Sequence, residues 1–186
     1  EALARIQVLN EDGEIAQGEK DFVQFRLETP VTVLPNERFI VRSYSPQITI
    51  AGGKILDGLS IKHRRKDLSE TIIYLQKLAD SLKVDDKESE VKLFLEKAGE
   101  IGFSIKDLQA KTGWVDSILR EILQEVLTKK SVIEAEGIYL SRNVFEGLAE
   151  KTAKAIQNHH KAEPLSRGML RETLREKIFG HLPTEI

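Results

Sequence analysis

The chain has 186 residues, with 28 Lys and Arg against 30 Asp and Glu, and a net charge of −2 at pH 7. At roughly 150 residues per domain, this length indicates one or two domains. The 40% hydrophobic and 31% charged content is that of a globular protein and excludes a chain that is disordered throughout. The chain has no Cys, which excludes a disulfide scaffold, a thiolate metal site and a Cys nucleophile.

The sequence carries no targeting or membrane signal. No apolar run approaches the ~20 residues of a membrane-spanning helix, and the first residues lack the basic and apolar regions of a signal peptide. We therefore expect a cytoplasmic monomer without a membrane partner. Because the chain starts at Glu1, inside an expected strand, we also expect it to be a fragment of a longer protein.

Charge is distributed unevenly along the chain. Residues 1–57 and 85–141 carry net charges of −3 and −4, whereas residues 58–84 and 142–186 carry +3 and +2. The near-neutral total argues against a protein that binds nucleic acid over its whole surface, so only short stretches could meet phosphate. The densest is Lys62-His63-Arg64-Arg65-Lys66, for which a solvated helix start or linker is the ordinary explanation.

Residues 1–57 show the pattern of short β-strands. Apolar and polar residues alternate within short runs that Pro and Gly separate. The expected strands lie at residues 4–8, 23–27, 31–33, 38–43 and 48–50. Gly52-Gly53 is expected to interrupt the chain after the last of them. Such strands suggest a small antiparallel barrel or sandwich, whose set of strands is incomplete.

From Asp67 onward the spacing of apolar residues becomes helical. Leu68, Ile72, Leu75 and Leu82 predict one amphipathic helix. The following elements come in the order of a winged helix, which is a helix-turn-helix followed by a β-hairpin wing. They are a helix through 91–98, a short strand at 102–103, helices at 105–111 and 114–128, and a hairpin of 131–136 with 138–141. Ser104 and Asp107 have the spacing of a cap at the start of the second helix.

The end of the chain repeats the opening of this pattern. A helix through Val144 and Ile156 is followed by an expected break at His159–Pro164. A further helix, with Ser166 as its cap, contains Leu170 and Leu174. The third helix and the wing are missing, so the sequence predicts only the start of a second winged helix.

No catalytic or metal-binding set emerges from the sequence. Gly53-Lys54 lacks both the preceding Gly and the following Ser or Thr of a phosphate-binding loop. His159 and His160 would point about 100° apart on a helix, and no further ligand stands at metal-site spacing. We expect no catalytic residue, cofactor or metal in this chain.

Two helices bear on nucleic-acid binding. The helix at 114–128 carries Asp116, Glu121 and Glu125 against the single base Arg120, which argues against deep insertion into DNA. Near the end of the chain, Arg167, Arg171 and Arg175 have the spacing of one helix face. A solvated or domain-contact face is favoured there over RNA contact.

The stretch RFIVRSYSPQITIAGGKILDGLSIKHRR, residues 38–65, resembles the selenocysteine-specific translation elongation factors, SelB. Their third EF-Tu-like β-barrel domain ends in the pattern R-F-x-x-R-S-Y-S-P, then T-I-x-G-G-x-x-L-D, then a K-H-basic run. Ala51 and Gly58 depart from it, where the family often has Gly and Pro. The segment PLSRGMLRETLREK, Pro164–Lys177, is similar to the start of the family's second winged helix. The resemblance thus spans the whole chain.

The resemblance implies that the intact protein is a GTP-dependent factor that delivers selenocysteinyl-tRNA to the ribosome at UGA codons. GTP and Mg²⁺ would bind a GTPase domain outside this chain, and terminal winged helices, also outside it, would bind an mRNA hairpin. Here the β part would help to hold the tRNA, and the first winged helix would be a non-catalytic spacer. On charge and position, the candidate RNA-phosphate contacts are Arg42, Lys62, Arg64, Arg65, Lys66, Arg167 and Arg171.

We therefore expect a multi-domain α+β chain, with a portion of an antiparallel β-barrel followed by winged-helix modules. The expected parts are a partial barrel at 1–60, a linker helix at 61–84, a first winged helix at 85–142 and an incomplete second one at 143–186. Two alternatives stay open. The chain could be a winged-helix transcription regulator that binds DNA, or a protein-interaction spacer that shows no salt-dependent RNA binding.

Overall fold

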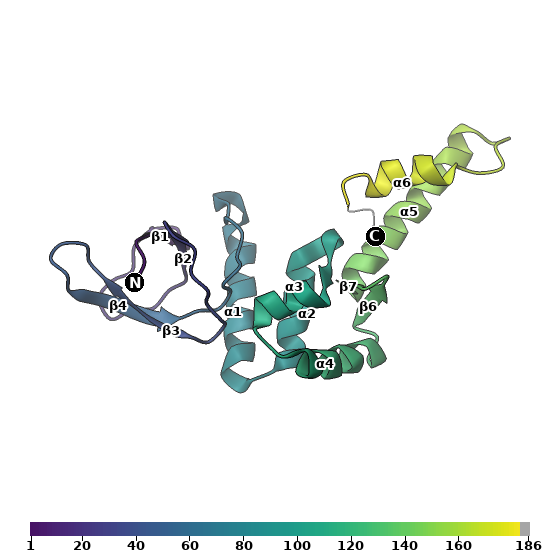
Figure 1. Cartoon of the computed structure of the whole chain (residues 1–186). Coiled ribbons are helices and arrows are strands. Elements are labelled where there is room, and N and C mark those ends of the chain that lie inside the picture. The colour runs from purple at the N-terminus through teal and green to yellow at the C-terminus, as the bar shows by residue number, and fades with distance from the viewer. Residues whose placement is uncertain (183–186) are drawn as a thin grey trace. The chain divides into compact units, whose positions relative to one another are not determined.

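The computed structural model describes residues 1–182, except for the side chain of Arg65. The last four residues of the predicted second winged helix, 183–186, lie outside this range. The chain divides into two compact units. The first comprises Glu1–Lys87 with Lys111–Gly113, and the second comprises Glu88–Ala110 with the chain from Trp114 onward (Figure 1). Antiparallel strands precede a largely helical part, which confirms the α+β class.

Two antiparallel strand pairs form the β part of the first unit. β1 (Ala4–Val8) pairs with β2 (Val23–Leu27), and β3 (Arg38–Arg42) pairs with β4 (Thr49–Lys54). Each pair is a separate two-stranded sheet, so the described strands do not close a barrel. The rings of Phe25 and Phe39, one from each pair, meet edge to face with their centroids 5.0 Å apart. This contact joins the two strand pairs through their aromatic side chains.

Two predictions about this region were wrong. Residues 31–33 form no strand, and Gly52-Gly53 lies inside β4 instead of ending a strand. Gly53 faces Phe39 across the ladder. A Cβ at Gly53 would lie 2.7 Å from the far end of the Phe39 ring, so a larger residue there would require the ring to shift.

A helix is present where the apolar spacing predicts one: α1 (Leu68–Val84) follows the short 3₁₀ turn η1 (Arg65–Asp67). Leu75 and Leu78 are buried on one face with Thr71 and Ser81. This 3- and 4-residue spacing is the one that the apolar stripe predicts. The helix ends at Asp85, which takes the left-handed conformation with φ of 56° and donates its N–H to the Ser81 carbonyl.

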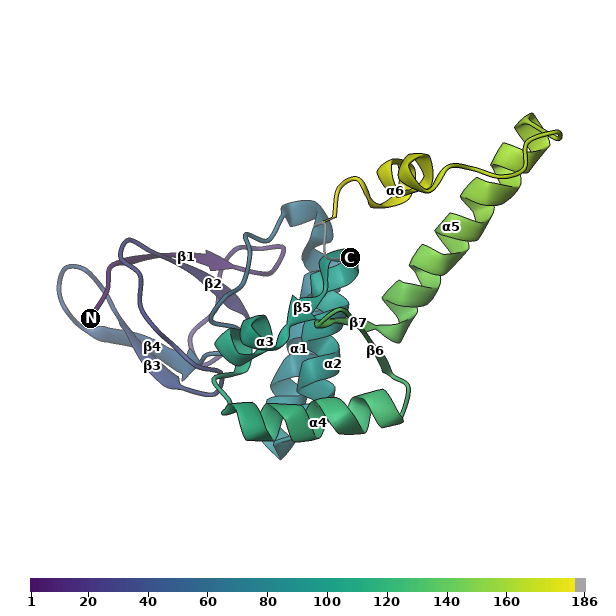
Figure 2. The ribbon, with the colours of Figure 1, turned by 45° about the vertical axis from the view of Figure 1, so that its right-hand side comes forward.

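The elements that follow form a winged helix, as predicted. They are α2 (Lys87–Ala98), η2 (Gly99–Ile101), β5 (Phe103–Ser104), α3 (Ile105–Thr112), α4 (Asp116–Thr128), β6 (Val132–Ala135) and β7 (Ile138–Ser141). The three strands make one antiparallel sheet in the order β5-β7-β6 (Figure 2). Phe94, Leu119, Val126 and Leu140 are among the buried side chains of the second unit, so its helices and its wing contribute to one apolar core.

The last two helices differ in detail from the prediction. α5 (Arg142–Ala162) runs through His159 and His160 without the expected break. Pro164 restricts only the residue before it, so the helix can continue to Ala162. α6 (Arg171–Phe179) starts after Leu170. Ser166 does not cap it, because its hydroxyl bonds the Gly168 carbonyl and N–H in a local turn. None of the helices in residues 1–182 combines the length and the apolar content that crossing a membrane requires.

Candidate nucleic-acid interface

The candidate phosphate contacts fall into two groups. Arg42, Lys62, Arg64 and Lys66 belong to the first unit, and Arg167 and Arg171 belong to the second. All six side chains are exposed, and within residues 1–182 none of them makes a side-chain hydrogen bond or an ion pair. Such cations can bind phosphate without first breaking an ion pair with a carboxylate. The seventh candidate, Arg65, has its side chain outside the described part of the structure.

The basic run at 62–66 is held by a buried glutamine of β2. The Gln24 side chain donates to the Ile61 carbonyl at 2.8 Å and accepts from the backbone N–H of His63 at 3.3 Å. His63 is buried, whereas Lys62 and Arg64 on either side of it are exposed. The segment therefore presents these two cations from a fixed backbone, and His63 has a structural place between them.

Asp57, which belongs to the SelB-like pattern, also has a structural role. Both of its carboxylate oxygens lie 2.8 Å from Nζ of Lys111, which also donates to the Leu59 carbonyl at 3.1 Å. The Asp57 and Lys111 side chains are only 5% and 12% exposed. The Asp57 carboxylate is thus neutralised by Lys111 inside the first unit and offers no negative charge to a partner. Burial of the Tyr74 side chain, and secondarily the nearby Asp57 charge, raises the pKa of Tyr74 well above its ordinary value.

The tip of the β3–β4 hairpin presents an aromatic residue to which the sequence analysis assigned no role. Tyr44 is 84% exposed. Its loop is closed by bonds from the Ser43 N–H to the Ile48 carbonyl at 2.9 Å and from the Ile48 N–H to the Pro46 carbonyl at 2.8 Å. Arg42 ends the strand just before it. Tyr44 lies between two predicted strands and close to Pro46, and this position in the sequence could have predicted an exposed turn.

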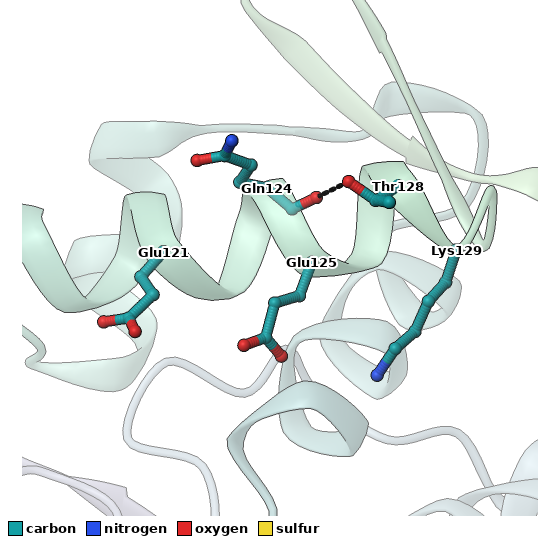
Figure 3. A pocket seen from close by; sticks show the side chains of 5 residues that line it. All are labelled: Glu121, Gln124, Glu125, Thr128 and Lys129. Carbon is teal, nitrogen blue, oxygen red and sulfur yellow. Dashed lines mark hydrogen bonds between the residues drawn. The ribbon is translucent and has the colours of Figure 1, made fainter.

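The acidic character predicted for the third helix of the winged helix is present on the surface of α4. A shallow pocket of about 330 Å³ is lined by Glu121, Gln124, Glu125, Thr128 and Lys129 (Figure 3). The only base within α4, Arg120, binds Asp116 one turn earlier at 2.5 Å, and this hydrogen bond raises the pKa of Arg120. Lys129, after the helix, binds Glu88. This face offers carboxylates where a DNA-reading helix would offer cations and amides.

The predicted arginine face near the end of the chain is only partly formed. The spacing in the sequence predicted that Arg167 and Arg171 share a helix face. Arg167 instead precedes α6, so the two side chains do not share one. Arg171 is the first residue of α6, and Glu172 follows it. Leu165 and Leu170 beside them are 99% and 73% exposed. The arrangement is a loose mixture of cations and apolar side chains.

The histidine pair at the end of α5 is part of a local structure. Nε2 of His159 lies 3.1 Å from Oγ of Ser166 and 3.2 Å from the Gly168 carbonyl. Within residues 1–182, no group of three His, Cys, Asp or Glu side chains is placed to hold a metal ion. His159 is thus held by polar groups of its own segment.

Comparison with known proteins identifies what this architecture is similar to. Residues 1–62, which contain all four strands of the first unit, match the family "Selenocysteine-specific elongation factor, beta-barrel domain". The chain is also 29% identical, over 179 residues, to the selenocysteine-specific elongation factor of Desulfomicrobium baculatum. The predicted resemblance to SelB is confirmed. That alignment covers 94% of this chain and 27% of the SelB protein from D. baculatum.

A solved structure supports the fold along almost the entire chain. It is described as the crystal structure of the bacterial selenocysteine-specific elongation factor EF-Sec. The TM-score is 0.61 at 17% sequence identity, with 95% of this chain and 25% of the EF-Sec chain covered. The chain thus spans about a quarter of the length of each of these SelB-like proteins.

Proposed function

We propose that this chain is the non-catalytic RNA-handling part of a SelB-type elongation factor. The intact factor would deliver selenocysteinyl-tRNA to the ribosome at UGA codons with GTP and Mg²⁺ bound in a separate GTPase domain. The first unit would help to hold the tRNA, and the winged helix would be a spacer that leads to mRNA-hairpin-binding modules. The parts would be a partial barrel at 1–60, a linker helix at 61–84, and winged helices from 85 and from 143.

The observation that carries this proposal is the contrast between the two surfaces. Lys62, Arg64 and Lys66 are exposed and unpaired within residues 1–182, on a segment that Gln24 fixes. The helix α4, which would read bases in a DNA-binding winged helix, instead exposes Glu121 and Glu125. Uncompensated cations attract a phosphate backbone, and carboxylates repel it. RNA binding is therefore expected on the first unit and not on α4.

A binding titration of the whole chain tests this proposal. Fluorescence anisotropy would be measured with a tRNA, an mRNA hairpin and a DNA duplex, each at ~50 and ~200 mM salt, where phosphate-driven binding weakens steeply. We expect the tRNA to bind, and a variant with Lys62→Ala, Arg64→Ala and Arg65→Ala to lose about tenfold or more in affinity at the lower salt concentration.

A control variant removes negative charge from the surface that is not expected to bind. Glu121→Gln and Glu125→Gln on α4 should leave tRNA affinity nearly unchanged, because α4 lies outside the proposed interface. Absence of tRNA binding in the unmodified chain would leave it a protein-interaction spacer. Tight and sequence-selective binding to the DNA duplex would instead support a transcription regulator.

A further inference from the structure

The exposed side of α4 combines apolar and acidic side chains in one line. Ile118, Glu121 and Glu125 follow one another at intervals of three and four residues, so they share one face of the helix. Ile118 is 39% exposed, and both Glu side chains are exposed. Val115, which directly precedes the helix, is 61% exposed. These four residues form the outer face of α4, with an apolar end followed by two carboxylates one turn apart.

The two carboxylates of this face are not compensated by the chain itself. Within residues 1–182, the side chains of Glu121 and Glu125 make no hydrogen bond and no ion pair. The nearby cations Arg120 and Lys129 pair with other carboxylates. Figure 3 shows the Glu121 and Glu125 side chains projecting from the same side of α4. They therefore form a negative pair that is open to a cation from outside.

The stability of α4 does not account for this pair. Like charges four residues apart destabilise a helix. Glu125 also lies in the last turn of α4, where the helix dipole favours a cation over a carboxylate. A partner that brings positive charge would relieve both effects. In the described part of the chain, no third His, Cys, Asp or Glu joins the pair to hold a metal ion, so an organic cation is the better match.

The apolar end of the face narrows the chemistry of this partner. Carboxylates repel a phosphate backbone, which argues against a nucleic acid. Val115 and Ile118 require an apolar surface beside the positive charge. A basic amphipathic helix supplies both, because Lys or Arg side chains one turn apart lie next to its apolar stripe. The 13 residues of α4 offer such a helix a contact length of about 20 Å.

We propose that the outer face of α4 docks a basic amphipathic helix of a protein partner. Cations of that helix pair with Glu121 and Glu125, and its apolar side chains cover Val115 and Ile118. The shallow pocket of about 330 Å³ that both Glu residues line gives room for the long cationic side chains. This inference goes beyond the proposed function, in which the winged helix is a spacer, and it does not depend on RNA binding by the first unit.

The test is a fluorescence anisotropy titration of the whole chain with a labelled synthetic peptide. The peptide is a helix of ~18 residues, with Leu along one face and Lys residues one turn apart beside it. A control peptide contains the same residues in scrambled order, so its net charge is equal and its apolar face is lost. We expect the amphipathic peptide to bind at least about tenfold more tightly than the scrambled one at ~50 mM salt.

Charge reversal on the chain tests whether the carboxylates contact the peptide. Glu121→Lys combined with Glu125→Lys should lower the affinity about tenfold or more at ~50 mM salt. A peptide with Glu in place of Lys should bind this variant more tightly than it binds the unmodified chain. The matched control is Glu172→Lys with Glu176→Lys, which reverses two exposed carboxylates at the same spacing on α6. It should change the affinity by less than about twofold at ~200 mM salt.

Ile118→Ala tests the apolar part of the face. It should weaken binding by about threefold at both ~50 and ~200 mM salt, because salt does not screen an apolar contact. The effect of charge reversal should shrink at the higher concentration. Circular dichroism checks folding, and should the reversed variant unfold, Glu121→Gln with Glu125→Gln should still lose about threefold in affinity.

The possible failures are distinguishable from those of the proposed function. Equal binding of the two peptides, or equal losses in the two charge-reversed variants, would overturn the docking face, because net charge alone would then explain binding. Absence of binding by the amphipathic peptide would also overturn it, and tRNA binding by the first unit would be unaffected. Binding of an RNA duplex that Ile118→Ala weakens would overturn it as well, because the face would then belong to nucleic acid.

Discussion

At the scale of single residues, the Asp57–Lys111 pair shows how a charge in the SelB-like pattern can serve the fold. Lys111 Nζ has both carboxylate oxygens and the Leu59 carbonyl within 3.1 Å, and the two side chains are nearly out of water. Desolvating two charges is costly, and only a close pairing with further hydrogen bonds offsets that cost. Removal of the Asp57 carboxylate would take away the negative charge that faces Lys111 in this buried pair.

We therefore expect Asp57→Asn to destabilise the chain by about 3 kcal/mol. The amide keeps the shape of the carboxylate but not its charge, so Lys111 would remain desolvated beside a neutral group. Urea unfolding followed by circular dichroism measures the effect. Asp80→Asn is the control, since Asp80 and Lys83 form an exposed pair and its loss should leave the unfolding midpoint unchanged. Equal shifts for the two variants would contradict the structural role of Asp57.

At the scale of elements, α3 begins with a reciprocal cap. The Ser104 N–H donates to Oδ2 of Asp107 at 2.9 Å, and the Asp107 N–H donates to Oγ of Ser104 at 3.3 Å. Ser104→Ala should cost about 1 kcal/mol of stability, because one helix-end N–H loses its acceptor. Thermal unfolding measures this loss. Ser117→Ala, at an exposed position of α4, should have a much smaller effect, and a comparable effect there would argue against capping as the cause.

Elements were predictable where local signals decide the structure. The Ser104 cap and the apolar stripe through Leu68, Ile72, Leu75 and Leu82 are local, and the helices they predict are present. Elements that depend on distant contacts were not predictable. Gly53 pairs with Phe39 inside β4, and the Phe39 ring occupies the space that a side chain at Gly53 would take. Ser166 looks like a helix cap in the sequence, but its hydroxyl satisfies Gly168 instead. The candidate cations could be named from charge, but whether Arg167 and Arg171 share a helix face depended on where α6 begins.

At the scale of the whole molecule, acid stability depends on carboxylates that link separate elements of the second unit. Hydrogen bonds from Lys129, and then from Lys92, hold the pKa of Glu88 below its ordinary value of 4.5. Lys151, and then His181, do the same for the pKa of Glu100. A lowered pKa in the folded state means that these pairs stabilise the fold fully above that ordinary value. This contribution is lost as the pH falls below it, because protonation breaks the pairs.

Replacing both carboxylates therefore tests how the second unit is held. A variant with Glu88→Gln and Glu100→Gln should be less stable than the unmodified chain at about pH 7 and should lose less stability between about pH 5 and pH 3. Urea unfolding at a series of pH values measures both effects. Glu96→Gln, at an exposed position of α2, should keep the full pH dependence. If the double variant kept it as well, other carboxylates would have to account for acid unfolding. If the double variant instead converged with the unmodified chain at low pH, Glu88 and Glu100 would be the groups whose protonation loosens the contacts of α2 and η2 with the rest of the unit.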